Sequence, residues 1–197
     1  MGTCIVLASS SPYRRQLLDR LRVPFETVAP EVDETAQAGE TPLQTARRLA
    51  LLKASTVGQR RPEAIVIGSD QVAEMDGLAI GKAGAHEAAL RQLIAMQGRT
   101  VVFHTALTVL RHADERVCSE CVDTWVSFRR LPLDALDAYL RLDQPYDCAG
   151  SARIESLGVC LVESVRSDDP TALIGLPLIK LTTMLADYGV ALPAPSR

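Results

Sequence analysis

The chain has 197 residues, 47% hydrophobic and 23% charged, which is the composition of an ordinary globular protein with a sizeable core. Its formal net charge of −3 argues against a surface that coats nucleic acid. No apolar run approaches the roughly 18 residues of a membrane span, and the N-terminus lacks a signal-peptide pattern. We therefore expect a cytoplasmic protein with neither a nucleic-acid nor a membrane partner.

The N-terminal part of the chain favours an anion site at the start of a helix. An apolar strand over residues 3–8 is followed by three serines, residues 9–11. Ser11 can cap a helix with Pro12 at its first position, and a helix N-terminus offers unpaired N–H groups to anions. With Arg14 nearby, this is a candidate phosphate site, although a well-capped, solvated helix start would show the same residues.

An acidic loop and a long helix come next. A strand over residues 25–29 leads into the acidic loop 31–34. Such loops are usually only solvated, but near a phosphate site their carboxylates suit Mg²⁺ or Mn²⁺. Residues 41–44, Thr-Pro-Leu-Gln, match a capping box and predict a helix to about residue 57. Lys53 lies near the edge of its apolar face, where it could point into a cleft or simply snorkel.

A short buried strand is predicted over residues 64–67, followed by Gly68-Ser69-Asp70. Because ligands bind at the carboxyl ends of strands in open α/β sheets, Asp70 would reach solvent, metal and substrate there. A plain polar turn is the alternative. Farther on, Asp76-Gly77 predicts a hairpin turn that returns Lys82 toward the level of Asp70.

The remaining pattern alternates between helices and strands. We predict helices over 86–96 and 133–142, an antiparallel strand pair over 100–111 and 116–128, a strand over 159–165 and a last helix after Pro177. Cys118 and Cys121 form a C-x-x-C pair inside one predicted strand, where their side chains would point to opposite faces. This spacing within a strand argues against a zinc site, and we expect reduced, mostly buried thiols.

Seven short motifs occur in a fixed order along the chain. They are Ser9-x-Ser11-Pro12-x-Arg14-Arg15, Glu31-Val32-Asp33-Glu34, Lys53, Gly68-Ser69-Asp70, Gly81-Lys82, Cys148-Ala149-Gly150 and Gly175-Leu176-Pro177. Together they resemble the Maf family of nucleotide pyrophosphatases, over residues 7 to about 185. The resemblance implies an α/β fold with a mixed twisted sheet, flanking helices and a long central cleft, related to the inosine triphosphatase fold. We expect one such domain over 1–197, undivided or arranged as two lobes around the cleft.

The resemblance also implies a reaction and a set of site residues. A house-cleaning enzyme of this kind hydrolyses a nucleoside triphosphate to the monophosphate and pyrophosphate with Mg²⁺ or Mn²⁺, commonly as a homodimer. Asp70 would accept a proton or orient the attacking water beside the metal. The implied catalytic residues are Asp70, Lys82 and Glu34, the substrate-binding residues are Ser9, Ser11, Arg14 and Lys53, and the metal ligands are Glu34 and Asp70.

Substrate types within the family differ at three positions, here Tyr13, Gln71 and Glu155. The dTTP and UTP type has Arg, Thr and Gln there, whereas the 7-methyl-GTP type has Trp, Gln and Glu. The chain matches the second type at two positions and has another aromatic residue at the third. A physical reason agrees, because N7 methylation gives guanine a positive charge that an aromatic face and a carboxylate both attract.

Two alternatives stay open beside 7-methyl-GTP hydrolysis. The same fold could act on dTTP, UTP or another modified nucleotide. The chain could instead be a nucleotide-binding regulator of cell division with little catalysis. The presence of Asp70 with Lys53 and Lys82 argues against a pure binding role, because binding phosphate does not require a positioned aspartate.

Overall fold

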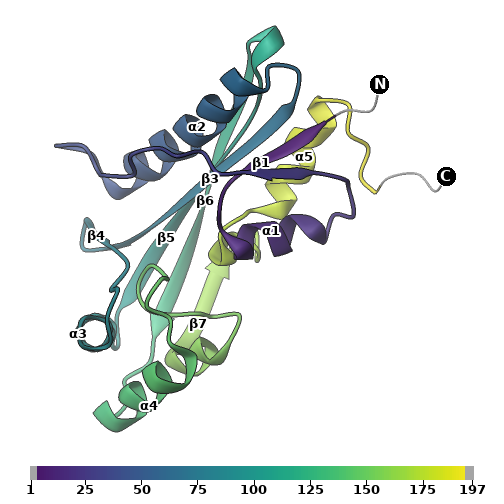
Figure 1. The fold of residues 1–197 in the computed structure, drawn as a ribbon. Helices are drawn as coiled ribbons and strands as arrows, with labels where there is room; N and C mark the ends of the chain where they lie inside the picture. The colour runs from purple at the N-terminus through teal and green to yellow at the C-terminus, as the bar shows by residue number, and fades with distance from the viewer. Residues whose placement is uncertain (1–3, 194–197) are drawn as a thin grey trace.

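The computed structural model describes residues 4–193, and a seven-stranded mixed sheet forms its centre (Figure 1). The strands are β1 (Ile5–Ala8), β2 (Glu26–Val28), β3 (Ile65–Met75), β4 (Leu78–Ile80), β5 (Thr100–Arg111), β6 (Arg116–Phe128) and β7 (Val162–Ser167). Their order is β2-β1-β3-β5-β6-β7, and β4 pairs with β3 beside this path. β1 is parallel to β2 and β3, whereas the other pairs are antiparallel.

Helices cover both faces of the sheet. They are α1 (Pro12–Asp19), α2 (Pro42–Arg60), α3 (His86–Met96), α4 (Leu133–Asp143) and α5 (Leu178–Asp187), with short 3-10 turns η1 (His112–Asp114), η2 (Leu157–Leu161) and η3 (Ala172–Ile174). Figure 1 shows α2 on one side of the long strands, α1 and α5 on the other, and α3 and α4 toward the far end. This arrangement is the expected mixed α/β fold.

The alternation of side chains along β3 divides the core between the two faces. Val66 packs with Ala54 and Val57 of α2. Ile65 and Ile67 join the cluster formed by α1 and α5 on the opposite face. Consecutive residues of a strand point to opposite faces of the sheet. The apolar residues on one face of β3 are therefore buried by α2, and those on the other face by α1 and α5.

Several predicted elements are confirmed. β5, β6 and α3 have the predicted ends, and the turn at Asp76-Gly77 joins β3 to β4 with positive φ at both residues. The capping box at Thr41 is present, and the helix that it begins continues to Arg60. The predicted and observed bounds agree because apolar and polar residues alternate regularly in these strands and the helices have clear start and stop residues.

Three predicted elements need correction. The strand that begins near Ile65 does not end before Gly68; it continues to Met75, because β5 pairs with it from Val66 to Glu74. The strand predicted over 159–165 begins at Val162, since the preceding residues form the 3-10 turn η2. The strand predicted over 3–8 begins at Ile5, and residue 3 lies outside the described part of the chain. Of the domain expected over 1–197, residues 1–3 and 194–197 likewise lie outside the described part.

One edge of β3 is open in its middle. β1 pairs with β3 only as far as Gly68, and β4 pairs with it only from Ala73. Neither strand reaches residues 69–72, so within residues 4–193 only β5 pairs with this part of β3. A strand edge without a neighbour leaves backbone N–H and C=O groups available on that side. The candidate site lies at this opening.

Gly68 allows α2 to lie unusually close to β3. A Cβ atom on Gly68 would stand 2.8 Å from the backbone nitrogen of Ala54 and would also meet the carbonyl oxygen of Ala50. Real side chains do not tolerate such contacts with backbone. The glycine therefore fixes the short distance between helix and strand that brings Lys53 to the neighbouring Asp70.

The cysteines and the helices test two further expectations. All five cysteines are free thiols, but Cys4 and Cys160 are exposed and the others are half-buried. The expectation of mostly buried thiols is therefore wrong, because Cys4 precedes β1, Cys160 lies in the exposed part of η2, and Cys118 and Cys121 only border the apolar clusters. Within residues 4–193, none of the helices is both long enough and apolar enough to cross a membrane.

Candidate active site

A cleft of about 810 Å³ opens over the unpaired edge of β3. Its walls come from the start of α1, the acidic loop after β2, α2, the segment after β4 and the loops that flank η2 and η3. All of the site residues predicted from sequence line this one cleft: Ser9, Ser11, Tyr13, Arg14, Glu34, Lys53, Asp70, Gln71, Lys82 and Glu155. Residues that are far apart in the sequence therefore meet in one place.

Lys53 of α2 connects the two predicted metal-binding carboxylates. Its Nζ lies 2.6 Å from Asp70 Oδ1 and 2.9 Å from Glu34 Oε1. The Lys53 side chain is only 4% exposed, and Asp70 is likewise buried, whereas Glu34 lies at the open side of the cleft. One desolvated ammonium thus bridges a buried carboxylate and an exposed one.

The surroundings move the pKa values of the two carboxylates in opposite directions. Burial raises the pKa of Asp70 above its ordinary value, although Lys53 and Arg14 partly offset this effect. Burial also acts to raise the pKa of Glu34, but the hydrogen bond and charge of Lys53 outweigh it and lower that pKa. Asp70 is therefore the better proton acceptor of the two near neutral pH.

The start of α1 holds the serines and Arg14 as the sequence predicts. Ser11 is the N-cap residue, and its Oγ accepts a hydrogen bond from the Arg14 backbone N–H at 3.4 Å. Ser9 Oγ accepts from the Ser11 N–H at 3.1 Å. The Arg14 side chain donates from Nε to the Gly175 carbonyl at 2.9 Å, which directs the guanidinium into the cleft. Burial lowers the pKa of Arg14, while Asp70 and Glu34 oppose that change.

Lys82 enters the cleft from the segment after β4. Its backbone forms an isolated antiparallel bridge with Ala149, and the nearby Gly84 N–H donates to the Tyr146 carbonyl at 3.0 Å. The Cys148-Ala149-Gly150 motif therefore supports the backbone that carries Lys82. The predicted return of Lys82 to the level of Asp70 places both residues in the same cleft.

Gln71 faces the side of the sheet opposite Asp70. Its Nε2 lies 2.9 Å from Thr105 Oγ1 and 3.0 Å from the carbonyl oxygens of Ala172 and Leu173. An amide nitrogen has two hydrogens, so these acceptors fully engage it. The Gln71 side-chain oxygen is the group that can accept a hydrogen bond from a ligand.

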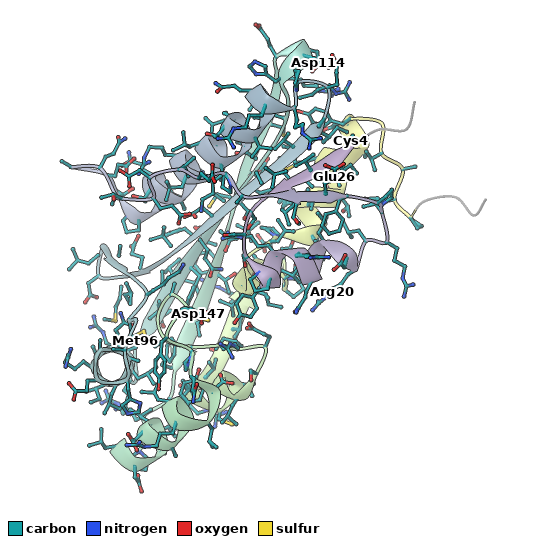
Figure 2. The ribbon with its side chains drawn as sticks, in the orientation of Figure 1. Cys4, Arg20, Glu26, Met96, Asp114 and Asp147 are labelled. Carbon is teal, nitrogen blue, oxygen red and sulfur yellow. The ribbon has the colours of Figure 1, made fainter. Side chains whose placement is uncertain are left out.

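Tyr13 and Glu155 lie at the other end of the cleft, among charged residues. The Arg153 guanidinium lies 5.6 Å from the centre of the Tyr13 ring and 3.5 Å from Asp147 Oδ1. Asp143 also pairs with Arg153, at 3.8 Å. Asp147 lies on the loop after α4 (Figure 2). Its side chain also lines the cleft. Asp147 and Glu155 line this end of the cleft, and together with Asp143 beside Arg153 the carboxylates here outnumber the one guanidinium.

Burial shifts the pKa values of both predicted specificity residues. It raises the pKa of Glu155, with Arg153 acting in the opposite direction. It also raises the pKa of the Tyr13 hydroxyl, and the Cys148 side chain adds to this. Both groups thus lie in a partly desolvated part of the cleft, where contacts with a charged base are stronger than in water.

Sequence reasoning missed several residues that shape the cleft. The Gly175 carbonyl orients Arg14, although the Gly-Leu-Pro motif was visible and only predicted a helix start. Gly175 adopts a φ of 120°, a conformation that favours glycine, so the motif has a second role. Arg153 and Asp147 carried no local signal, because their partners lie far away in sequence.

The cleft offers a divalent metal few protein ligands, but their chemistry suits one. Within residues 4–193 there is no group of three or more His, Cys, Asp or Glu side chains that could enclose a metal ion. Glu34 and Asp70 nevertheless converge on one cation, the Lys53 ammonium. One or two carboxylates combined with phosphate oxygens and water is the usual protein environment of Mg²⁺, so the donor set suits Mg²⁺ or Mn²⁺.

The fold is shared with a solved structure. A HAM1 protein from Coxiella burnetii superposes with a TM-score of 0.54, covering 94% of this chain and 100% of that chain at 17% identity. The mixed sheet with its flanking helices therefore places the chain in this α/β class, as expected from the sequence.

The family is defined by sequence. The Maf-like protein family matches residues 4–188, and the chain belongs to that family. A 7-methyl-GTP pyrophosphatase of Ralstonia nicotianae is 58% identical, covering 92% of this chain and 93% of its own. Proteins of the same name from Cupriavidus metallidurans and Burkholderia pseudomallei are each 55% identical, covering 94% and 98% of this chain and 93% and 92% of their own. The family expected from the ordered motifs is confirmed.

Proposed function

We propose that this chain is a nucleotide pyrophosphatase that cleaves the α–β phosphoanhydride of 7-methyl-GTP. The observation that carries the proposal is a single cleft with two different ends. One end holds cations around the buried Asp70, and the other holds Tyr13 among carboxylates. The relatives named 7-methyl-GTP pyrophosphatase support the same substrate.

The phosphate end would act mainly through position and charge. Arg14, Lys53 and Lys82 would bind the triphosphate oxygens and stabilise the charge that develops as pyrophosphate leaves. Asp70 would accept a proton from the water that attacks the α-phosphorus, or hold that water in position. The raised pKa of Asp70 supports the first of these roles, because a base is most effective when its pKa approaches the working pH.

A bound divalent metal would supply charge neutralisation on the phosphates and a Lewis acid. Glu34 and Asp70 would hold it. Their different exposure suits this arrangement, because Glu34 lies at the mouth of the cleft and Asp70 at its base.

The base end would select a cationic purine. Glu155 and Asp147 would offset the positive charge of the methylated ring, and the Tyr13 ring would contact its face. The Gln71 side-chain oxygen would accept a hydrogen bond from an N–H group of the base. Arg153 would not bind the base itself, because it is already paired with Asp143 and Asp147.

The free thiols and the family resemblance bear on where the enzyme works and how it assembles. We propose that the chain works as one domain around the cleft, in the cytoplasm and as a homodimer. The free thiols agree with a reducing compartment, and homodimers agree with the family resemblance.

The test is a pyrophosphate-release assay with Mg²⁺ or Mn²⁺ across 7-methyl-GTP, GTP, dTTP and UTP. We expect kcat/KM to be highest for 7-methyl-GTP. A preference for dTTP or UTP would contradict the substrate but leave the pyrophosphatase activity. Binding of all four nucleotides without release of pyrophosphate from any of them would favour the regulator alternative.

A further inference from the structure

Lys53 occupies the place that a metal ion would need. Its Nζ is within 2.9 Å of one oxygen from each of Glu34 and Asp70, the two carboxylates proposed as metal ligands. The side chain is 4% exposed, so the ammonium is held in this position by the protein rather than by water. These ion pairs of Glu34 and Asp70 are made by Lys53 and not by Lys82 of the same cleft.

The charges do not allow both cations to share this place. The two carboxylates face two cations, the Lys53 ammonium and the Arg14 guanidinium, so this group of side chains is already neutral. A divalent metal beside the ammonium would give an excess positive charge and bring two cations into close contact in a poorly solvated site. A triphosphate changes this balance, because its oxygens offer the ammonium a new partner within the same cleft.

We propose that Lys53 is a resident cation that fills the metal position of the nucleotide-free enzyme and transfers to a phosphate oxygen when a metal–nucleotide complex enters. The inference rests on the proposed function. It means that Lys53 weakens the binding of metal alone and that metal and nucleotide strengthen each other's binding, as linkage requires. The binding of metal alone, which would place an unneeded cation at Asp70, is thereby disfavoured.

The test compares Mn²⁺ binding to three nucleotide-free proteins by isothermal titration calorimetry at pH 8. In Lys53→Met the two carboxylates lose their resident cation, and we expect the Kd for Mn²⁺ to fall at least tenfold from the wild-type value. Lys82→Met is the matched control, because it removes the same charge from the same cleft and leaves Lys53 in place. We expect its Kd to change no more than about threefold.

A Kd for Lys53→Met that is no lower than that for Lys82→Met would overturn the proposal. A second measurement needs no methionine variant and covers the case in which Lys53→Met does not fold. In ¹⁵N NMR of the wild-type lysine ammonium groups, with the Lys53 signal assigned by comparison with Lys53→Arg, Mg²⁺ alone should leave that signal unchanged. Mg²⁺ with α,β-methylene 7-methyl-GTP should shift it. Displacement of Lys53 by Mg²⁺ alone would also overturn the proposal.

The outcome separates this inference from the proposed function. If the wild type hydrolyses 7-methyl-GTP but Lys53→Met and Lys82→Met have the same Kd for Mn²⁺, the function is retained and the role of Lys53 is rejected. Tighter Mn²⁺ binding by Lys53→Met with no pyrophosphate release from any nucleotide would support the resident cation and reject the function.

Discussion

At the scale of single residues, the most consequential contact is the one between Lys53 and Asp70. Burial of an unpaired charge is costly. The buried position of Asp70 therefore indicates that its carboxylate binds a cation or accepts a proton. The ion pair explains how the folded protein retains it. The raised pKa of Asp70 shows that the pair does not fully offset the loss of water.

Asp70→Asn should lower kcat for 7-methyl-GTP by a factor on the order of 10²–10⁴, the usual contribution of a general acid or base. The amide keeps the shape of the side chain but cannot accept the proton, so the fold should be retained. Steady-state pyrophosphate release checks this. Glu87→Gln, an exposed change at the start of α3 and outside the cleft, is the control and should leave kcat unchanged. Near-normal turnover by folded Asp70→Asn would remove Asp70 from the mechanism.

The raised pKa of Asp70 predicts the direction in which the free energy of unfolding changes with pH. A carboxyl group whose pKa is raised by folding stabilises the protein fully below the unfolded value, about 3.9, and this contribution is lost as pH rises through the folded value. The amide of the Asp70→Asn variant does not titrate and would not show this loss. Urea unfolding of metal-free wild type and Asp70→Asn should therefore show the variant gaining relative stability between about pH 3.5 and pH 7. A relative loss over the same interval would mean that the folded pKa is depressed.

Glu155→Gln should reduce kcat/KM for 7-methyl-GTP more than for GTP. The two substrates share the triphosphate, so the ratio isolates the response to ring charge. Replacing a charge-assisted contact by a neutral one should change that ratio by roughly 1–2 kcal/mol, or about five- to thirty-fold. Tyr13→Leu should move the ratio in the same direction. Equal losses for both substrates would show that neither residue senses the charge of the base.

At the scale of elements, the close packing of α2 on β3 positions the chemistry. Gly68→Ala should destabilise the protein by at least about 1–3 kcal/mol, because the new methyl group meets the backbone of α2 and overpacks the interface. It should also lower kcat, since the helix that carries Lys53 must move away from Asp70. Gly81→Ala is the matched control, because a Cβ there meets no atom within 4 Å of the described structure. Equal unfolding free energies for the two variants would contradict the argument.

At the scale of the whole molecule, the cleft joins elements from both ends of the chain, so a bound nucleotide should stabilise all of them together. At a concentration of one hundred times Kd, Mg²⁺ with α,β-methylene 7-methyl-GTP should add about 2.7 kcal/mol, which corresponds to a rise in Tm of roughly 5–11 °C. Differential scanning fluorimetry measures this shift. The dTTP analogue at the same molar concentration is the comparison, and an equal shift with it would show that only the phosphate end contributes.

The sequence allowed many of the elements to be predicted but few of the contacts. β5, β6 and α3 were predictable because side-chain periodicity and turn residues act locally. The continuation of β3 through Gly68 and Asp70 was not, because hydrogen bonds from β5 stabilise a polar stretch that by itself favours a turn.

The sequence allowed the residues that line the candidate site to be predicted, but not the contacts that they make with one another. The ordered motifs indicated that Asp70, Lys53 and Arg14 belong together. Nothing near Tyr13 indicated that Arg153 would lie against its ring, since that contact depends on how the whole sheet is assembled. The same applies to the Gly175 carbonyl, which reaches Arg14 across 161 positions.

The opening at the edge of β3 has a consequence for how this protein can change. Asp70 and Gln71 are adjacent, yet Asp70 contacts Lys53 of α2 while Gln71 contacts η3 on the other face. Both line one cleft because none of the strands in the described part of the chain closes the edge beside them. The proposed function would therefore assign Asp70 to bond cleavage and its neighbour Gln71 to recognition of the base. On that proposal, a mutation of Gln71 would alter which nucleotide is accepted while the Asp70–Lys53 pair stays in place, so the base preference could change without the loss of catalysis.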